Sequence, residues 1–99
     1  MSKLKLKKWD VVEHLQTDED IALFLDASIE EDPGDGSVIR SALGSIAKAR
    51  GMTQLARDTG LAREGLYKAL SEEGNPEFGT IMKVIRALGL RLRAENTPV

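Results

Sequence analysis

The segment GMTQLARDTGLAREGLYKAL, residues 51–70, most constrains the fold of this chain, because a glycine joins two short amphipathic runs. Thr53 is predicted to cap a short helix over residues 54–59, and Gly60 to supply the positive φ that a tight turn requires. Leu61 then enters a second helix that continues to the end of the segment. Two short helices joined this tightly must pack on other helices, so the segment favours an all-α fold.

Four further helices are predicted from apolar residues at helical spacing, bounded by capping and breaking residues. They cover residues 10–15, 18–28, 37–50 and 76–88. The caps and stops expected at their ends are Asp10, Thr17, Gly51, Asn75 and Gly89. The stretch EDPGDGS is expected to be a loop. The fold class predicted for residues 1–99 is therefore one domain, a small all-α bundle of five to six helices.

One apolar face of each predicted helix is expected to form the core. The inward residues predicted in this way are Val11, Val12, Leu15, Ile21, Ala22, Phe24, Leu25, Ile39, Leu43, Ile46, Ala47, Leu61, Leu66, Phe78, Ile81, Met82, Ile85 and Leu88.

Both ends of the chain alternate between basic and apolar residues, in KLKLKK at the start and LRLR near the end. This period is typical of short β-strands, with Leu4 and Leu6 on one face of the first and Leu90 and Leu92 on one face of the second. Such strands would pair within one chain or between two copies, and the sequence leaves both options open.

Charge is unevenly distributed along the chain. Residues 9–35 contain ten acidic residues and no Lys or Arg, whereas residues 46–70 carry five basic and two acidic residues. A basic face on an otherwise acidic molecule can bind phosphates, and an acidic lobe suits a basic protein partner. The alternative for the acidic stretch is the solvated face of its helices.

Composition argues against several classes of function. The chain has no cysteine, which removes disulfides, thiolate chemistry and the usual zinc ligands and is compatible with a reducing cytoplasm. Its longest apolar run is IALFL, too short to span a membrane. His14 is the sole histidine, and consecutive carboxylates on a helix diverge rather than converge on a metal ion. We therefore expect neither an enzyme nor a metal or cofactor site.

Residues 51–70 meet the demands of a DNA-binding helix-turn-helix, in which the second helix lies in the major groove. Ala56 is small where the two helices approach, Gly60 allows the turn, and Leu61 and Leu66 hold the second helix from behind. The alternative is a plain helical hairpin with a solvated basic surface.

The outward residues of the second helix are predicted to contact DNA. Arg63 suits a bidentate contact to guanine, Lys68 a phosphate or guanine, Tyr67 a phosphate or thymine methyl, and Glu64 a cytosine or a neighbouring arginine. Thr53 and Gln54 lie where the free backbone N–H groups of the first helix can meet a phosphate.

The tracts GMTQLA, GLAREGLYKAL and GNPEFGT resemble the Cro/repressor-like helix-turn-helix domain, over residues 37–93. Together with WDVVEHL and DEDIALFLDASIEED, they are similar to the addiction-module antidote proteins, the HigA-like antitoxins. The resemblance implies an antitoxin that neutralises a RelE/HigB-like ribonuclease toxin and, as a dimer, represses its own operon by binding double-stranded DNA. The acidic residues 1–35 are then the candidate toxin-binding or dimer segment.

Two features depart from the wider helix-turn-helix class. Thr-Gln usually stands two residues further before Leu-Ala than Thr53 and Gln54 do, and the second helix usually opens with Ser where this chain has Ala62. Ala62 lacks the side-chain oxygen of a cap, so DNA binding is expected either to be weaker or to rest more on Arg63 and Lys68. The alternatives are a stand-alone regulator and an interaction protein that has lost DNA binding.

Overall fold

The computed structural model describes residues 8–98, and the described chain is all-helical. Its six helices are α1 (Lys8–His14), α2 (Asp18–Glu31), α3 (Ser37–Arg50), α4 (Met52–Thr59), α5 (Arg63–Ala69) and α6 (Phe78–Ala87). The all-α bundle predicted from the sequence is therefore confirmed. None of the described helices is long and apolar enough to cross a membrane.

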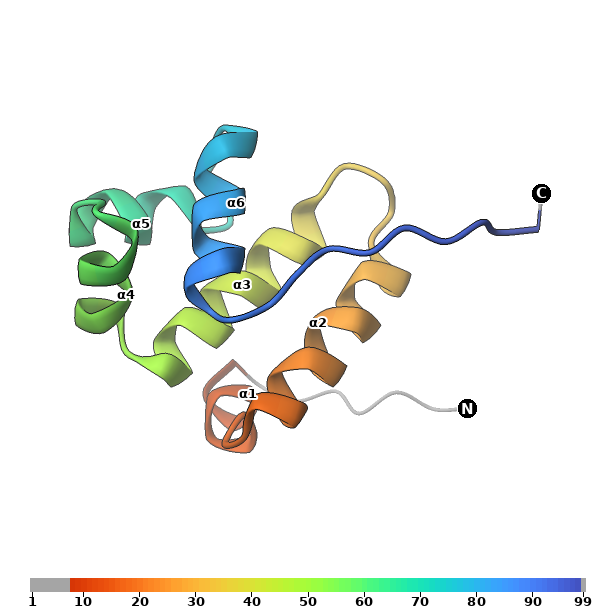
Figure 1. Cartoon of the computed structure of the whole chain (residues 1–99), viewed down its shortest axis with the longest axis horizontal. Helices are drawn as coiled ribbons and strands as arrows, with labels where there is room; N and C mark the ends of the chain where they lie inside the picture. Colours follow the sequence, from red (N-terminus) through yellow and green to blue (C-terminus); the bar gives the residue numbers. More distant parts are fainter. Residues whose placement is uncertain (1–7, 99) are drawn as a thin grey trace.

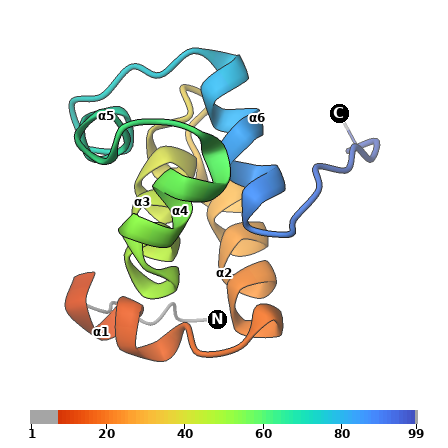
Figure 2. The ribbon, with the colours of Figure 1, turned by 60° about the vertical axis from the view of Figure 1, so that its left-hand side comes forward.

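Helix α3 lies at the centre of the bundle (Figure 1). Helices α1 and α2 pack against α3 at one end of the molecule, while α4 and α5 lie at the other end (Figures 1 and 2). Helix α6 packs against α4 and runs beside the middle of the bundle. The acidic helix α2 and the pair α4–α5 are therefore separated by α3.

The core collects buried apolar residues from α2 to α6 and from the junctions, and Val11 of α1 packs against it. Its buried members are Leu15, Ile21, Leu25, Ala42, Leu43, Ile46, Ala47, Met52, Leu55, Leu66, Leu70, Val84, Ile85 and Leu88. Most predicted inward residues are buried or partly buried, but Ala22 is exposed and Phe78 is 72% exposed. Phe78 shares the stripe of Ile81 and Ile85, yet it lies in the first turn of α6, beyond the end of the core.

Four predicted helix starts and caps are wrong. Asp10 lies inside α1, and Thr53 lies inside α4, whose N-cap is Gly51. Helix α6 begins at Phe78 with Glu77 as its N-cap, so neither Asn75 nor Pro76 starts it. Glycine at position 51 serves both helices, because its backbone (φ 108°, ψ 116°) ends α3 and turns directly into α4.

Helix α2 begins with the predicted cap and is stabilised by a complete capping box. The side chain of Thr17 accepts the N–H of Asp20, and the carboxylate of Asp20 accepts the N–H of Thr17 at 3.1 Å. The backbone N–H groups of Gln16 and Thr17 hold the pKa of Asp20 below its ordinary value. The start of this helix is thus specified by residues adjacent in sequence.

The predicted loop between α2 and α3 is organised by one carboxylate. Asp32 accepts hydrogen bonds from the backbone N–H groups of Gly34, Gly36, Val38 and Ile39 at 2.8–3.2 Å. Partial burial by itself would raise the pKa of Asp32, but these four donors outweigh it and lower that pKa. Asp32 therefore caps α3 from outside the helix, a role that its N-cap Gly36 has no side chain to perform.

The alternation near the chain end does not produce a strand in the described residues. Residues 90–98 follow α6 as irregular chain and run away from the α4–α5 end (Figure 1). The predicted strand over Leu90 and Leu92 is therefore wrong, and its predicted partner residues, Leu4 and Leu6, lie outside the described residues. No described residues form a strand beside this segment, and alternation alone does not stabilise a single strand.

Candidate nucleic-acid interface

Helices α4 and α5 are joined by a tight turn at Gly60, and we refer to residues 52–70 as the α4–α5 hairpin. Gly60 adopts the predicted left-handed conformation (φ 75°, ψ 12°), and its N–H donates to the carbonyl of Ala56 at 2.9 Å. The hydroxyl of Thr59 donates to the carbonyl of Leu55 at 2.9 Å and accepts the N–H of Leu61 at 3.2 Å. The turn is thus held by one glycine and one side-chain bridge.

Apolar residues fix the inner face of the hairpin. Leu66 of α5 is fully buried and Leu55 of α4 is 1% exposed, while Ala56 and Leu61 are partly buried against the same core. The predicted inward positions of Leu61 and Leu66 are therefore confirmed. Because both helices are anchored along one side, their opposite sides are free for solvent or a partner.

The C-terminal end of α5 is held by residues of α3. The guanidinium of Arg40 donates to the carbonyls of Ser71 and Glu72 at 2.9 and 2.7 Å. A Cβ placed on Gly44 would stand only 2.9 Å from the carbonyl oxygen of Leu70, so a side chain there would push α5 away from α3. These contacts set the distance and orientation of α5.

Sequence reasoning missed Arg40, Gly44 and Thr59. A signal existed for Gly44, because an isolated glycine within an otherwise regular helical pattern marks close backbone approach. No comparable signal existed for Arg40, whose partners lie more than 30 residues further along the chain.

The outward face of α5 carries the predicted DNA-contacting residues. Arg63, Glu64 and Lys68 are exposed, and Tyr67 is 43% exposed. The guanidinium of Arg63 lies 5.7 Å from the centre of the Tyr67 ring, which places these two side chains together. Ala62 is the N-cap of α5 and makes no side-chain capping hydrogen bond. This face therefore presents two cations, a carboxylate and a phenol to solvent.

Thr53 and Gln54 are exposed and lie in the first turn of α4. The first-turn N–H groups of a helix lack intrahelical acceptors, so they remain available to an anion. The side-chain amide of Gln54 donates to Asp58 on its own helix at 2.8 Å. In this conformation the Gln54 amide runs along α4, and the predicted phosphate contact at this position rests on the backbone N–H groups alone.

The acidic residues of the N-terminal half do not form a metal centre. No cluster of three or more His, Asp or Glu side chains within residues 8–98 is arranged to hold a metal ion. Asp18 instead forms an ion pair with Arg50 of α3 at 3.0 Å, which ties the start of α2 to the centre of the bundle. His14 is exposed at the end of α1.

Comparisons with known proteins cover almost the whole chain. Residues 5–96 match the model of a protein family described as "Probable addiction module antidote protein". The chain is also similar to a protein of Haemophilus influenzae described as uncharacterized, with 52% identity over 93 residues, or 94% of each chain. No solved structure shows a significant match. The similarity thus includes both the acidic helices and the α4–α5 hairpin.

Proposed function

Because the chain belongs to this addiction module antidote family, we propose that it is an antitoxin that neutralises a ribonuclease toxin by direct binding and represses its own operon. In this proposal the α4–α5 hairpin is a helix-turn-helix and α5 is its recognition helix. The observation that carries the DNA-binding part is the outward position of Arg63, Tyr67 and Lys68 on a helix whose Leu66 is fully buried on the other side. Such a helix presents charge and hydrogen-bond donors to a groove without disturbing the core.

Each outward residue has a chemical role in this proposal. Arg63 reads guanine through its two parallel donors, with its guanidinium oriented by the Tyr67 ring 5.7 Å away. Lys68 neutralises a phosphate or contacts guanine, and Glu64 accepts from cytosine or orients Arg63. The first-turn N–H groups at Thr53 and Gln54 hold a phosphate of the same duplex.

A dimer is part of the proposal, because one recognition helix covers few base pairs and two are needed to span half-sites about 34 Å apart. A groove of about 400 Å³ beside α6 offers a surface for the second copy, lined by Met82, Ile85, Arg86, Leu90, Arg91 and Leu92. Ile85 is itself core, so the apolar contact would come from Met82, Leu90 and Leu92. A monomer mass in light scattering that does not change with concentration would contradict the dimer.

The test of DNA binding is fluorescence anisotropy with the duplex from upstream of the protein's own gene. The double variant Arg63→Ala with Lys68→Ala should bind at least about tenfold more weakly and with a shallower salt dependence. The matched control is Lys83→Ala with Arg93→Ala, which removes the same charge from exposed positions outside the hairpin. Equal affinity of the Arg63/Lys68 variant and the wild type would rule out α5 as the reading helix.

A second candidate function is an interaction protein that has the fold but has lost DNA contact. Two observations favour it. Ala62 gives α5 no side-chain cap, and the Gln54 amide donates to Asp58, so each position lacks a side-chain contact that a recognition hairpin uses. In this case the wild-type protein would show no salt-sensitive binding to the upstream duplex, while its binding of a toxin would be intact.

A further inference from the structure

Helix α2 exposes a large apolar side chain in the middle of its outward face. Leu23 is 65% exposed, and among the large apolar residues that the structure describes only Phe78 is more exposed. The opposite side of the same helix buries Ile21, Leu25 and Ser28, so α2 already has the apolar contacts that hold it on α3. Leu23 therefore contributes little to the fold in the monomer.

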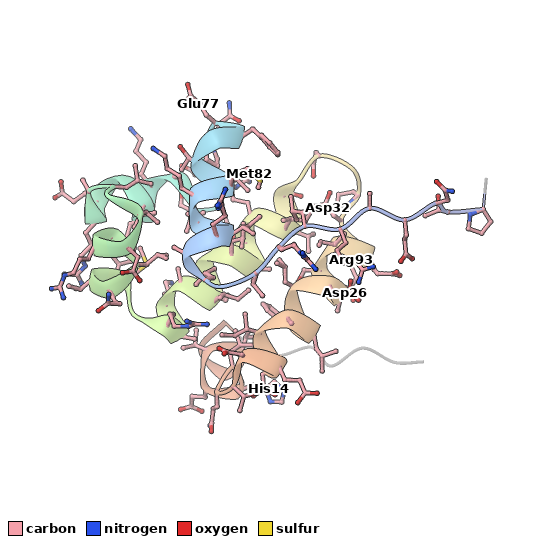
Figure 3. All side chains as sticks on the ribbon, in the orientation of Figure 1. His14, Asp26, Asp32, Glu77, Met82 and Arg93 are labelled. Carbon is pink, nitrogen blue, oxygen red and sulfur yellow. The ribbon has the colours of Figure 1, made fainter. Side chains whose placement is uncertain are left out.

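Acidic residues surround Leu23 at helical spacing. Glu19 lies one turn before it, Asp26 nearly one turn after it and Glu30 two turns after it, so the four residues share one face. Figure 3 shows Asp26 on this helix. Within the part of the chain that the structure describes, Glu19, Asp26 and Glu30 form no ion pair. We call these four residues the Leu23 face.

The negative charge of α2 indicates which kind of partner would fit this face. Helix α2 contains six acidic and no basic residues, so its outward face repels nucleic acid and attracts a basic surface. An exposed apolar side chain with charges before and after it on the same helix face has the layout of an interface anchor, whose neighbours exclude water once the partner is bound.

We propose that the Leu23 face is the surface that docks the toxin, and that the toxin is a basic protein with an apolar pocket for Leu23 and a Lys- or Arg-rich rim. This inference rests on the antitoxin role proposed above and assigns that role to one face of one helix.

The position of the Leu23 face has a consequence for assembly. Helix α2 lies to the right of α3 and the α4–α5 hairpin to its left in Figure 1, and α4 lies in front of α3 in the turned view of Figure 2. A toxin seated on α2 therefore leaves the hairpin accessible, and one antitoxin molecule can hold toxin and DNA together. Addition of toxin to the protein–DNA complex should produce a larger complex rather than free DNA.

The test measures the affinity of the full-length protein for the purified product of the adjacent reading frame by isothermal titration calorimetry. Leu23→Lys places a cation among the acids and removes the anchor, so it should weaken binding at least about tenfold. The control is Phe78→Lys, the same kind of change at a more exposed apolar residue on α6, which should bind within about twofold of the wild type. Far-UV circular dichroism should show that both variants retain the wild-type helix content.

A second pair of variants tests the acidic rim. Asp26→Lys with Glu30→Lys should slow association and reduce its salt dependence, while Glu73→Lys with Glu77→Lys, an equal charge change at exposed positions outside α2, should not.

The two proposals fail in distinguishable ways. If the wild type binds the adjacent gene product and Leu23→Lys binds it equally well, the Leu23 face is wrong and the antitoxin role stands. If the wild type itself does not bind that product, the antitoxin role fails and the docking surface fails with it. Release of DNA on toxin addition would contradict simultaneous binding.

Discussion

Helices α2 and α5 carry the two proposed binding faces, but they are stabilised in different ways. Helix α2 has 14 residues, a capping box between Thr17 and Asp20 and an ion pair from Asp18. Helix α5 has seven residues and no side-chain cap. It depends on the burial of Leu66 and on the contacts of its C-terminal end with α3.

The difference shows which contacts determine the orientation of each face. A seven-residue helix without a cap is unstable in isolation, so tertiary contacts must hold α5. Substitutions in α3 should therefore disturb the proposed DNA-binding face even though they lie outside it. The α2 face should instead respond mainly to changes in its own first turn.

Leu66→Ala should give the largest effect. Leu66 is fully buried, and removal of its side chain leaves a cavity beneath α5, so the free energy of unfolding should fall by about 2–5 kcal/mol. Urea denaturation followed by circular dichroism measures this change. A loss below about 1 kcal/mol would show that α5 is not anchored through this residue.

Gly44→Ala should have the second largest effect, because its Cβ would meet the Leu70 carbonyl oxygen at 2.9 Å. We expect a loss of about 1–3 kcal/mol and weaker DNA binding from a displaced α5. Gly65→Ala is the matched control, since a Cβ there meets nothing within 4 Å and alanine favours a helix by about 0.5–1 kcal/mol. Equal stability of the two variants in thermal melts would contradict the close contact between α3 and α5.

The side-chain cap can be removed from the start of α2 and added at the start of α5. Thr17→Ala removes the cap of α2 and should lower the free energy of unfolding by about 1 kcal/mol. Ala62→Ser supplies α5 with the cap it lacks and should raise that free energy by about 0.5–1 kcal/mol. Chemical denaturation of both variants checks the signs, and a destabilising Ala62→Ser would indicate that the backbone at Ala62 cannot accept a cap.

The smallest expected effect concerns how the free energy of unfolding depends on pH in acid. Asp20 and Asp32 have pKa values below the ordinary 3.8 in the folded protein, so their contribution to stability is present above pH 3.8. It is lost as the pH falls from 3.8 through the folded-state pKa values, because over this range the unfolded chain binds protons that the folded protein does not.

The variant Asp32→Asn removes one of these groups, and we expect it to show a weaker dependence of stability on pH below 3.8. Urea titrations at several pH values measure this slope. An unchanged slope would show that the four N–H donors at Asp32 do not favour its charged form.

Local chemistry made much of the fold predictable. The bounds of α3 follow from its apolar spacing and from Gly51, and the turn at Gly60 follows from the one residue type that readily adopts a positive φ. The start of α4 was mispredicted because the capping preference of Thr53 is weaker than the geometry of Gly51, which ends one helix and begins the next. Phe78 was mispredicted because periodicity identifies the apolar side of a helix but not where the core ends.

The outward residues of the candidate site could be predicted from the sequence, but the contacts that hold α5 on α3 could not. Arg63, Tyr67 and Lys68 fall on one face by helical spacing, but their closeness to one another depends on rotamers. The contacts of Arg40 and Gly44 join segments far apart in the sequence, and no local pattern specifies such pairs.

The division of the molecule into a DNA-binding end and a toxin-binding end is tested most directly by amide chemical-shift mapping. When the upstream duplex is added to the isotope-labelled protein, the account predicts shifts at Thr53, Gln54 and residues 63–68 and none at residues 19–30 of α2. Shifts concentrated in α2, with α5 unaffected, would contradict it.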